Sequence, residues 1–371
     1  MRQKLPDIPK IRVRISKDLN NMVVSGTDMK RMIYPIKDVR TYSGKKSVKF
    51  NCQNPVLGKK DKTKPILLAS FASKTGLISL DGEKYQGKLF VMTSPQLDSC
   101  EVINEISLEY YLDSLLTKEM NGNWPIEALK AQAVAARSYA LFKMMVNKTG
   151  QTFFDLESSE RDQVSGSFFD STANTLKATV ETKGEILITQ TGNLTPIFYH
   201  AQCGGGKTLL PSQVWGTEVE GYRSVPCVYS ERENGKGNWQ SKFPLRKFIQ
   251  FLEWAARQQN LSGAQESLAA NQKELMVAPD RVVNNKLRIY LGDKVYLVEK
   301  ALMRRFFNRE MFPSNHFVLS LNKKTVEVKG VGLGHGVGMP QLGAKTMAER
   351  GWNYKQILSY YFPVHKLKKI Y

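Results

Sequence analysis

Residues 108–120, LEYYLDSLLTKEM, predict an amphipathic helix with a carboxylate on its apolar side. At about 100° per residue, the leucines and one tyrosine form a single stripe, and Glu119 falls in the middle of it. Glu109, Asp113 and Lys118 lie on the flank of this stripe or on the far side. A charged carboxylate on a buried face is costly unless it is paired, hydrogen-bonded or held neutral. We therefore interpret Glu119 as a general acid that burial keeps protonated, with a structural ion pair as the alternative.

A second helix is predicted to begin at Pro125 and to run to about Asn147. Lys130 and Arg137, seven residues apart, lie inside its apolar stripe rather than opposite it. Two adjacent helices thus each place charge on a face that should be core. Either Glu119 and Arg137 form a buried ion pair that only fixes packing, or these charges line a cleft in which the cations bind substrate oxygens.

Short β-prone runs such as IRVRIS and PILLASF precede the two helices, and others such as KGEILITQ and TVEVKGVG follow them. This pattern predicts an α+β fold, with mostly β lobes around a central two-helix segment and a C-terminal β/α region. The expected regions are an N-terminal β-rich lobe at 1–104, a candidate catalytic core at 105–259, a polar insert or linker at 260–285, and the C-terminal part of the catalytic domain at 286–371.

The charge balance of the chain is unusual. Its 371 residues are 42% hydrophobic and 24% charged, which is typical of a globular protein. However, 54 Lys and Arg stand against 34 Asp and Glu, a formal net charge of +20. Such an excess indicates an anionic partner, namely nucleic acid, a membrane surface or an acidic cell-wall polymer, unless it serves only solubility.

Several classes of protein are disfavoured by the sequence. No nucleic-acid reader motif accompanies the positive charge, and the CGGGKT loop does not have the spacing of a phosphate-binding loop. No run of about 18 apolar residues predicts a transmembrane segment. The first residues, MRQKLPDIPK, lack the apolar core of a signal peptide.

The four cysteines, Cys52, Cys100, Cys203 and Cys227, contain no CxxC pair, which argues against zinc-ribbon chemistry. Cys203 and Cys227 flank one loop region and could form a disulfide in an oxidising compartment. His200 lies three residues before Cys203, which permits a metal site without arguing strongly for one. We expect no metal and no cofactor.

The central stretch NEISLEYYLDSLLTKEMNGNWPIEALKAQAVAARSYAL, residues 104–141, resembles the motif of the stage II sporulation protein D family. The resemblance extends to FYHAQCGGGKT at 198–208, VWG at 214–216, YRSVPC at 222–227 and GLGHGVGMPQLGA at 332–344. In the last motif the family commonly has Ser and Tyr where this chain has Pro340 and Leu342. Because proline has no backbone N–H and no hydroxyl, position 340 cannot donate a hydrogen bond.

Members of this family are peptidoglycan lytic transglycosylases, so the resemblance implies that Glu119 is the catalytic acid and base. The substrate-binding residues that it implies are Lys130, Gln132, Arg137, Tyr199, His200, His335 and Gln341. It also implies glycan strands as substrate, a cell-wall amidase as a partner and a location outside the cytoplasm. Some members bind zinc through His and Cys, but no full ligand set maps onto this sequence.

The implied reaction needs only one carboxylate. Ordinary glycosidases need two, because a nucleophile or a water must be supplied or activated. A lytic transglycosylase instead uses the C6 hydroxyl of N-acetylmuramic acid and forms a 1,6-anhydro product, so Glu119 could serve as acid and then as base. The alternative is a wall-binding protein or amidase activator that keeps the fold and cleaves nothing. The presence of Glu119 with Lys130 and Arg137 favours catalysis.

Overall fold

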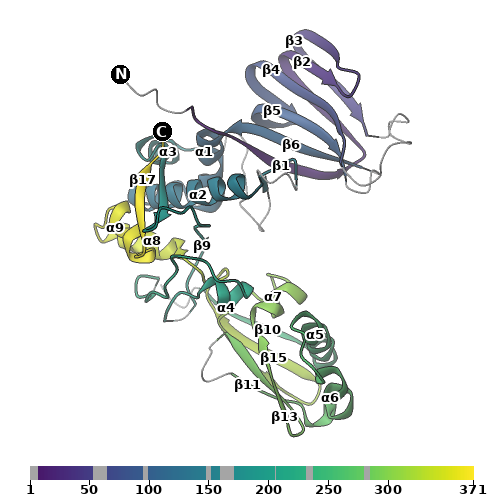
Figure 1. The fold of residues 1–371 in the computed structure, drawn as a ribbon, viewed down its shortest axis with the longest axis vertical. Helices are drawn as coiled ribbons and strands as arrows, with labels where there is room; N and C mark the ends of the chain where they lie inside the picture. Colours follow the sequence, from purple (N-terminus) through teal and green to yellow (C-terminus); the bar gives the residue numbers. More distant parts are fainter. Residues whose placement is uncertain are drawn as a thin grey trace. The chain divides into compact units, whose positions relative to one another are not determined.

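The computed structural model describes residues 7–52, 65–94, 99–147, 152–158, 171–204, 206–230, 237–279 and 285–371. It confirms the predicted α+β class, with helices inserted between groups of strands (Figure 1). The chain forms two compact units, which do not follow the four expected regions. Unit 1 comprises Met1–Ile188 and Leu367–Tyr371, and unit 2 comprises Thr189–Lys366. Among the described residues, no helix is long and apolar enough to cross a membrane.

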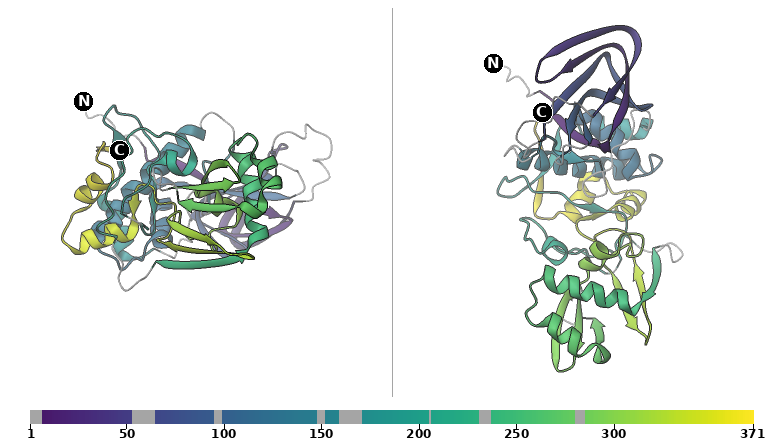
Figure 2. Two further views of the ribbon diagram at one scale, coloured as in Figure 1. Left: turned by 90° about the horizontal axis from the view of Figure 1, so that it is seen from below. Right: turned by 90° about the vertical axis from the view of Figure 1, so that its right-hand side faces the viewer.

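The N-terminal part of unit 1 is a seven-stranded, strongly curled sheet with the order β3-β2-β4-β5-β6-β1-β7 (Figures 1 and 2). Neighbouring strands are antiparallel, except that β7 runs parallel to β1. The strands are β1 (Lys10–Leu19), β2 (Asn21–Ile33), β3 (Asp38–Asn51), β4 (Leu67–Leu80), β5 (Glu83–Thr93), β6 (Cys100–Ser107) and β7 (Leu156–Glu157).

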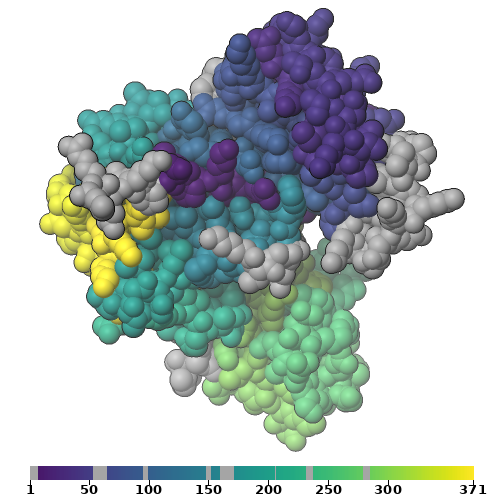
Figure 3. Space-filling model, turned by 45° about the horizontal axis from the view of Figure 1, so that its top comes forward, coloured from purple at the N-terminus to yellow at the C-terminus, as the bar shows by residue number. Residues whose placement is uncertain are grey.

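The two faces of this sheet differ in polarity because side chains alternate along each strand. Residues such as Met22, Val24 and Phe71 are buried in one apolar cluster inside the curl. A disulfide between Cys52 and Cys100 lies in the same cluster. Strand β3, at the edge of the sheet, is largely exposed, and the purple spheres of this region lie at the surface in Figure 3.

Three helices complete unit 1. Helix α1 (Leu108–Glu119) follows β6 directly, and α2 (Ile126–Asn147) begins just after Pro125, as the periodicity predicted. Helix α3 (Ala173–Glu181) is capped by Thr172 and leads into β8 (Glu185–Thr189), which pairs with β17 (His365–Lys369). Both predicted helices bury a stripe of leucine and alanine side chains, which explains why their positions could be read from the sequence.

One part of unit 2 is built on two three-stranded sheets, with orders β10-β15-β14 and β11-β12-β13. Their cores meet in one cluster rich in phenylalanine, which includes Phe248, Phe251 and Phe312. The elements are β10 (Asn238–Pro244), α5 (Leu245–Gln258), α6 (Ala264–Ala270), the short 3₁₀ helix η3 (Gln272–Glu274), β11 (Met276–Pro279), β12 (Lys286–Leu291), β13 (Lys294–Glu299), α7 (Ala301–Phe306), β14 (Phe317–Leu321) and β15 (Thr325–Val331).

The stretch 260–285, expected as a polar insert or linker, has regular structure where it is described. It contains α6, η3 and β11, and Leu268 is buried in the phenylalanine-rich cluster, with Leu275 and Val277 packed against it. Residues 280–284 lie outside the described part. A few apolar side chains anchor this otherwise polar segment in the core of unit 2. Residues 260–279 are therefore not a linker.

The rest of unit 2 carries the glycine-rich motifs. Strand β9 (Tyr199–His200) pairs in parallel with β16 (Met339–Pro340), so that Pro340 lies opposite His200. This pairing brings together the two motifs FYHAQC and GHGVGM, more than 130 residues apart in the chain. The helices here are α4 (Pro211–Trp215), α8 (Gln341–Glu349) and α9 (Tyr354–Tyr361).

Candidate functional site

Glu119 is the last residue of α1, at the point where the chain leaves the helix. Its side chain is partly buried, and the next residue, Met120, is extended and buried. The following turn is tightly built, because the backbone N–H of Asn123 donates to the side-chain oxygen of Asn121 at 2.9 Å. A side chain at Gly122 would approach Thr172 Oγ1 to 2.6 Å. Only glycine fits there, so the sequence NGN fixes the chain direction immediately after Glu119.

Arg137 is completely buried, and its partner is Glu109 rather than Glu119. Its Nε and Nη2 donate to the two carboxylate oxygens of Glu109 at 2.9 and 2.8 Å, and its Nη1 donates to the carbonyl of Glu185 at 3.0 Å. The hydroxyl of Tyr371 donates to the same carboxylate at 2.5 Å. The expectation of a cation that binds substrate oxygens does not fit this geometry, because the guanidinium is enclosed within unit 1.

Asp113, one turn further along α1, extends this buried group of charges. Its carboxylate accepts a short hydrogen bond from the Thr179 hydroxyl on α3. Burial raises the pKa of Asp113 to about 6, against the lowering effect of that hydrogen bond. The negative charge of Glu109 adds to the increase, and Arg137 opposes it. The face of α1 that carries Glu109 and Asp113 therefore packs on other elements, whereas the sequence placed both residues on the flank or the far side.

Lys130, the second predicted cation, lies in an ion-pair network of its own. Its Nζ lies 2.7 Å from Glu127 on the same helix and 2.7 Å from Glu181 on α3. Desolvation acts to lower the pKa of Lys130, but the hydrogen bonds to these two carboxylates raise it overall. This network links α2 to α3, which gives Lys130 a structural role in unit 1.

Gln132 differs from the two cations. It is fully buried on α2, and neither its Oε1 nor its Nε2 has a hydrogen-bond partner among the described residues. An unsatisfied buried amide costs about 1–3 kcal/mol, so such a side chain calls for a functional explanation more than a paired one does. Of the substrate-binding residues predicted in unit 1, Gln132 is the one whose side-chain polar atoms have no partner in the described part of the chain.

In unit 2, His200 and His335 are held by the same backbone segment. The Nδ1 of His200 donates to the carbonyl of Val337 at 3.0 Å, and the Nδ1 of His335 accepts from the N–H of Val337 at 3.0 Å. The two rings lie 5.6 Å apart between centroids. Burial lowers the pKa of His200 to about 3 and lowers the pKa of His335 well below its ordinary value. Both imidazoles are therefore neutral near pH 7, and neither supplies a positive charge to a transition state.

The remaining predicted residues, Tyr199 and Gln341, flank this histidine pair. Tyr199 is partly buried next to His200 in β9. Gln341 begins α8 and is 6% exposed, and its Nε2 has no partner among the described residues. Pro340 precedes it at the helix cap, where a missing N–H is tolerated. The departure from the family motif at this position therefore does not disturb the start of α8.

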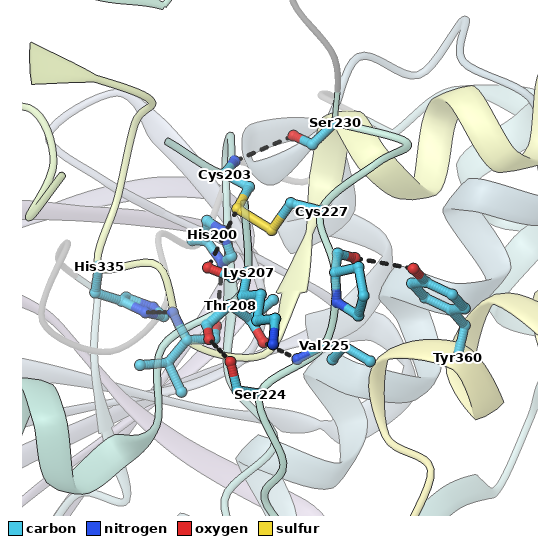
Figure 4. Close-up of a disulfide and its surroundings, with 12 residues drawn as sticks. His200, Cys203, Lys207, Thr208, Ser224, Val225, Cys227, Ser230, His335 and Tyr360 are labelled. Carbon is cyan, nitrogen blue, oxygen red and sulfur yellow. Dashed lines mark hydrogen bonds between the residues drawn. A yellow bond between two sulfur atoms is a disulfide. The ribbon is translucent and has the colours of Figure 1, made fainter. Parts of the chain in front are cut away.

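The second disulfide, between Cys203 and Cys227, closes a loop beside His200 (Figure 4). The loop is fixed by further hydrogen bonds, in which Ser230 Oγ accepts from the Cys203 N–H and the Tyr360 hydroxyl donates to the Pro226 carbonyl (Figure 4). Within the described ranges, no group of three or more His, Cys, Asp or Glu could hold a metal ion. Disulfide-bonded cysteines also cannot act as thiolate ligands.

An aromatic group in unit 2 was missed by sequence reasoning. Trp215 is 45% exposed, and its ring lies 4.6 Å from Phe198 and 5.1 Å from His335 between centroids. Tyr222 supports Phe198 from another side, at 5.8 Å. The only signal in the sequence was the VWG motif, which did not reveal that the tryptophan is at the surface.

Comparisons with known proteins agree with these motifs. Residues 96–188, which hold α1 and α2, match the family model described as Stage II sporulation protein. An uncharacterized protein of Brachyspira hyodysenteriae is 29% identical over 285 residues, covering 76% of this chain and 72% of that protein. The Stage II sporulation protein D of Bacillus subtilis is 26% identical over 274 residues, covering 70% of this chain and 74% of that protein.

A further relative, named Amidase enhancer, also comes from Bacillus subtilis. It is 27% identical over 329 residues, which cover 78% of this chain but only 45% of that longer protein. Together with the family model, these matches confirm the resemblance expected from the sequence. Over residues 96–188 and in its relatives, the chain is similar to the stage II sporulation protein D family.

Proposed function

We propose that this protein acts on the bacterial cell wall as a peptidoglycan lytic transglycosylase. Its substrate is the glycan strand, stripped of peptides, and it cleaves the β-1,4 bond between N-acetylmuramic acid and N-acetylglucosamine. The family and the names of its relatives support the general role in the cell wall. The observation that carries the specific reaction is the partly buried Glu119 at the end of α1, held in place by a turn that admits only glycine at position 122.

The proposed reaction uses Glu119 in two successive steps. As the bond from C1 of the muramic acid to the leaving oxygen breaks, the carboxyl group of Glu119 gives its proton to that oxygen. The C6 hydroxyl oxygen of the same sugar then attacks C1, and the Glu119 carboxylate takes the hydroxyl proton. The product is the 1,6-anhydro sugar, no water is consumed, and Glu119 returns to its starting state.

The surrounding charges support this role indirectly. Arg137 and Lys130 are occupied by Glu109 and by Glu127 with Glu181, so they hold the helices that present Glu119 rather than binding the sugar. Of the other predicted residues, we assign a direct contact with the glycan to Tyr199, which is partly buried in unit 2. The neutral histidines fix the backbone of the glycine-rich motif.

The proposed compartment lies outside the cytoplasm. All four cysteines of the chain are paired in two disulfides, and such bonds persist mainly in oxidising environments. A partner amidase would be found in the same compartment, where it could supply glycan stripped of peptides.

A second candidate function is the activation of an amidase without cleavage of the glycan. It is favoured by one observation, the similarity to the protein named Amidase enhancer. Two assays on the purified protein separate the candidates. The first measures anhydro ends released from peptide-free glycan, and the second measures stimulation of a purified cell-wall amidase. Release of anhydro ends supports the transglycosylase, whereas stimulation by a protein that releases none supports the activator.

A further inference from the structure

Trp215 combines three properties that are rarely found together in a purely structural tryptophan. Its side chain is 45% exposed, its ring packs on Phe198 and His335, and its indole N–H has no acceptor among the residues that the structure describes. Tryptophan usually finds a partner for its N–H when it serves a structural purpose in a core. An exposed ring with a free donor therefore offers both an apolar face and a polar handle to a ligand.

The position of Trp215 is set by its short helix and the glycine after it. Val214, the preceding residue, is buried in a small cluster with Leu209 and Val337, and this directs Trp215 to the outside. Gly216 then ends α4 with φ of +72°, a left-handed conformation that favours glycine. Each residue of the VWG motif thus has a structural role. Val214 anchors the helix in the core, Trp215 points outward, and Gly216 ends the helix.

The base under the indole ring is rigid. The ring of Phe198 packs against both Trp215 and Tyr222. The Tyr222 hydroxyl accepts from the Phe198 N–H and donates to the Pro196 carbonyl, both at 2.8 Å. His335, the second neighbour of the indole, is fixed through its bond with the N–H of Val337. A ring held in this way loses little conformational entropy when a ligand binds, which favours affinity.

The rim of this surface is polar rather than apolar. The residues that follow Trp215, Gly216 to Glu218, are exposed, and they include the hydroxyl of Thr217 and the carboxylate of Glu218. An apolar partner protein or a lipid surface would be matched by a wider apolar patch. A flat aromatic ring with polar groups at its edge instead matches a pyranose, which has an apolar C–H face and hydroxyl or acetamido groups around it.

We infer that Trp215, supported by Phe198 and His335, is a stacking site for a 2-acetamido pyranose of the glycan strand. The indole face covers the C–H face of the sugar, and the indole N–H donates to an acetamido carbonyl or a hydroxyl. This inference rests on the proposed function for the identity of the polymer. It adds a binding residue that acts on the bound sugar independently of Glu119.

The test uses the full chain with the Glu119→Gln substitution, so that binding is read without cleavage. The probe is a soluble tetrasaccharide of β-1,4-linked N-acetylglucosamine, followed by titration calorimetry and by the indole N–H signals in NMR spectra. Trp215→Ala should weaken binding roughly tenfold, and Trp215→Phe should weaken it roughly threefold or less, since phenylalanine keeps a stacking face. The indole signal that disappears in Trp215→Phe should be the one that shifts most on addition of the sugar.

A matched control is Trp352, a partly buried tryptophan of the same unit whose ring packs on Tyr229 and Tyr360 at 5.4 and 6.0 Å. Trp352→Phe should bind the sugar as the parent does. The inference is overturned if Trp215→Ala, folded as judged by its thermal melt, binds as tightly as the parent, or if the parent binds no tetrasaccharide. Loss of binding in Trp215→Ala while the wild-type chain releases no anhydro product would uphold the stacking site and reject the proposed reaction.

Discussion

Arg137, with no exposed surface, binds both carboxylate oxygens of Glu109 through its Nε and Nη2, and this pair joins α2 to the first turn of α1. The sequence offered Glu119 as the partner of Arg137, since both residues lie on apolar stripes. The structure gives that role to Glu109, nearly three turns earlier on the same helix. The two glutamates of α1 therefore have different roles. Glu109 fixes the packing of the helix, and Glu119, at its other end, is proposed to be the catalytic residue.

The structural role of Glu109 predicts that its substitution lowers stability more than the substitution of a glutamate in a partly exposed ion pair. Glu109→Gln should lower the free energy of unfolding by about 3–5 kcal/mol, because it leaves the Arg137 guanidinium buried without its counter-charge. Glu127→Gln, at the exposed side of the Lys130 network, should cost about 1 kcal/mol or less. Urea unfolding followed by circular dichroism measures both. A Glu109→Gln protein as stable as the parent would show that the buried pair does not hold the helices.

The raised pKa of Asp113 predicts that the folded protein becomes less stable as pH rises. Its pKa in the folded protein is raised by burial to about 6, so between about pH 4 and pH 6 the folded state holds a proton that the unfolded state has lost. The stabilisation is complete below about pH 4 and is lost as pH rises through about 6, with a magnitude on the order of 2 kcal/mol after screening by solvent. Asp113→Asn should remove this dependence and be more stable than the parent at about pH 8.

The comparison for this prediction is made on the same two proteins at about pH 3, where Asp113 is largely protonated in both the folded and the unfolded state. Asp113→Asn and the parent should then unfold at similar urea concentrations. If the difference in stability between the parent and Asp113→Asn were the same at both pH values, the raised pKa of Asp113 would be contradicted.

The lowered pKa values of the histidines in unit 2 predict the opposite pH dependence, a stability that falls as pH is lowered. Burial lowers the pKa of His200 to about 3 and those of His316 and His365 to about 4, and it lowers the pKa of His335 as well. The unfolded chain binds protons at about pH 6.5, so the stability these residues provide is present above that pH and is lost as pH falls toward about 4. Histidine side-chain NMR signals should show no protonation between about pH 8 and pH 5.5. A midpoint near pH 6.5 for His200 or His335 would contradict the neutral pair.

Much of the fold could be read from the sequence, because its main elements bury regular stripes. The helices at 108–119 and 126–147 follow from apolar periodicity, and the β-rich character of the N-terminal lobe follows from its short β-prone runs. The stretch from 260 was expected to be either an insert or a linker, and the sequence could not decide between the two, since its few apolar anchors, such as Leu268, are scattered among polar residues. The boundary between the two units was also missed, because it falls within β8 and not in a polar linker.

The site was less predictable than the fold. Periodicity found Lys130 and Arg137 on the inner face of α2, but it cannot say which carboxylate a buried cation meets, because Glu109, Glu181 and the Glu185 carbonyl reach them only in the tertiary structure. The exposure of Trp215 and the neutrality of His200 also depend on neighbours far apart in the chain. Composition likewise could not reveal the pairing of Cys52 with Cys100.

Gln132 offers a test of what an unsatisfied buried amide costs. Because its amide is buried without partners among the described residues, Gln132→Met keeps the volume and removes an unsatisfied polar group. We expect the variant to be about 1–2 kcal/mol more stable than the parent in urea unfolding. A variant that is less stable than the parent would show that the amide serves the fold.

The central claim is that Glu119 performs both proton transfers, and product analysis tests it most directly. Purified glycan strands, with and without prior removal of their peptides, are digested with the wild-type protein and with Glu119→Gln, and the products are examined by mass spectrometry. The wild type should release 1,6-anhydro products from the peptide-free strands, and Glu119→Gln should release none while melting at the same temperature. Equal release of anhydro products by the two proteins would contradict the assignment.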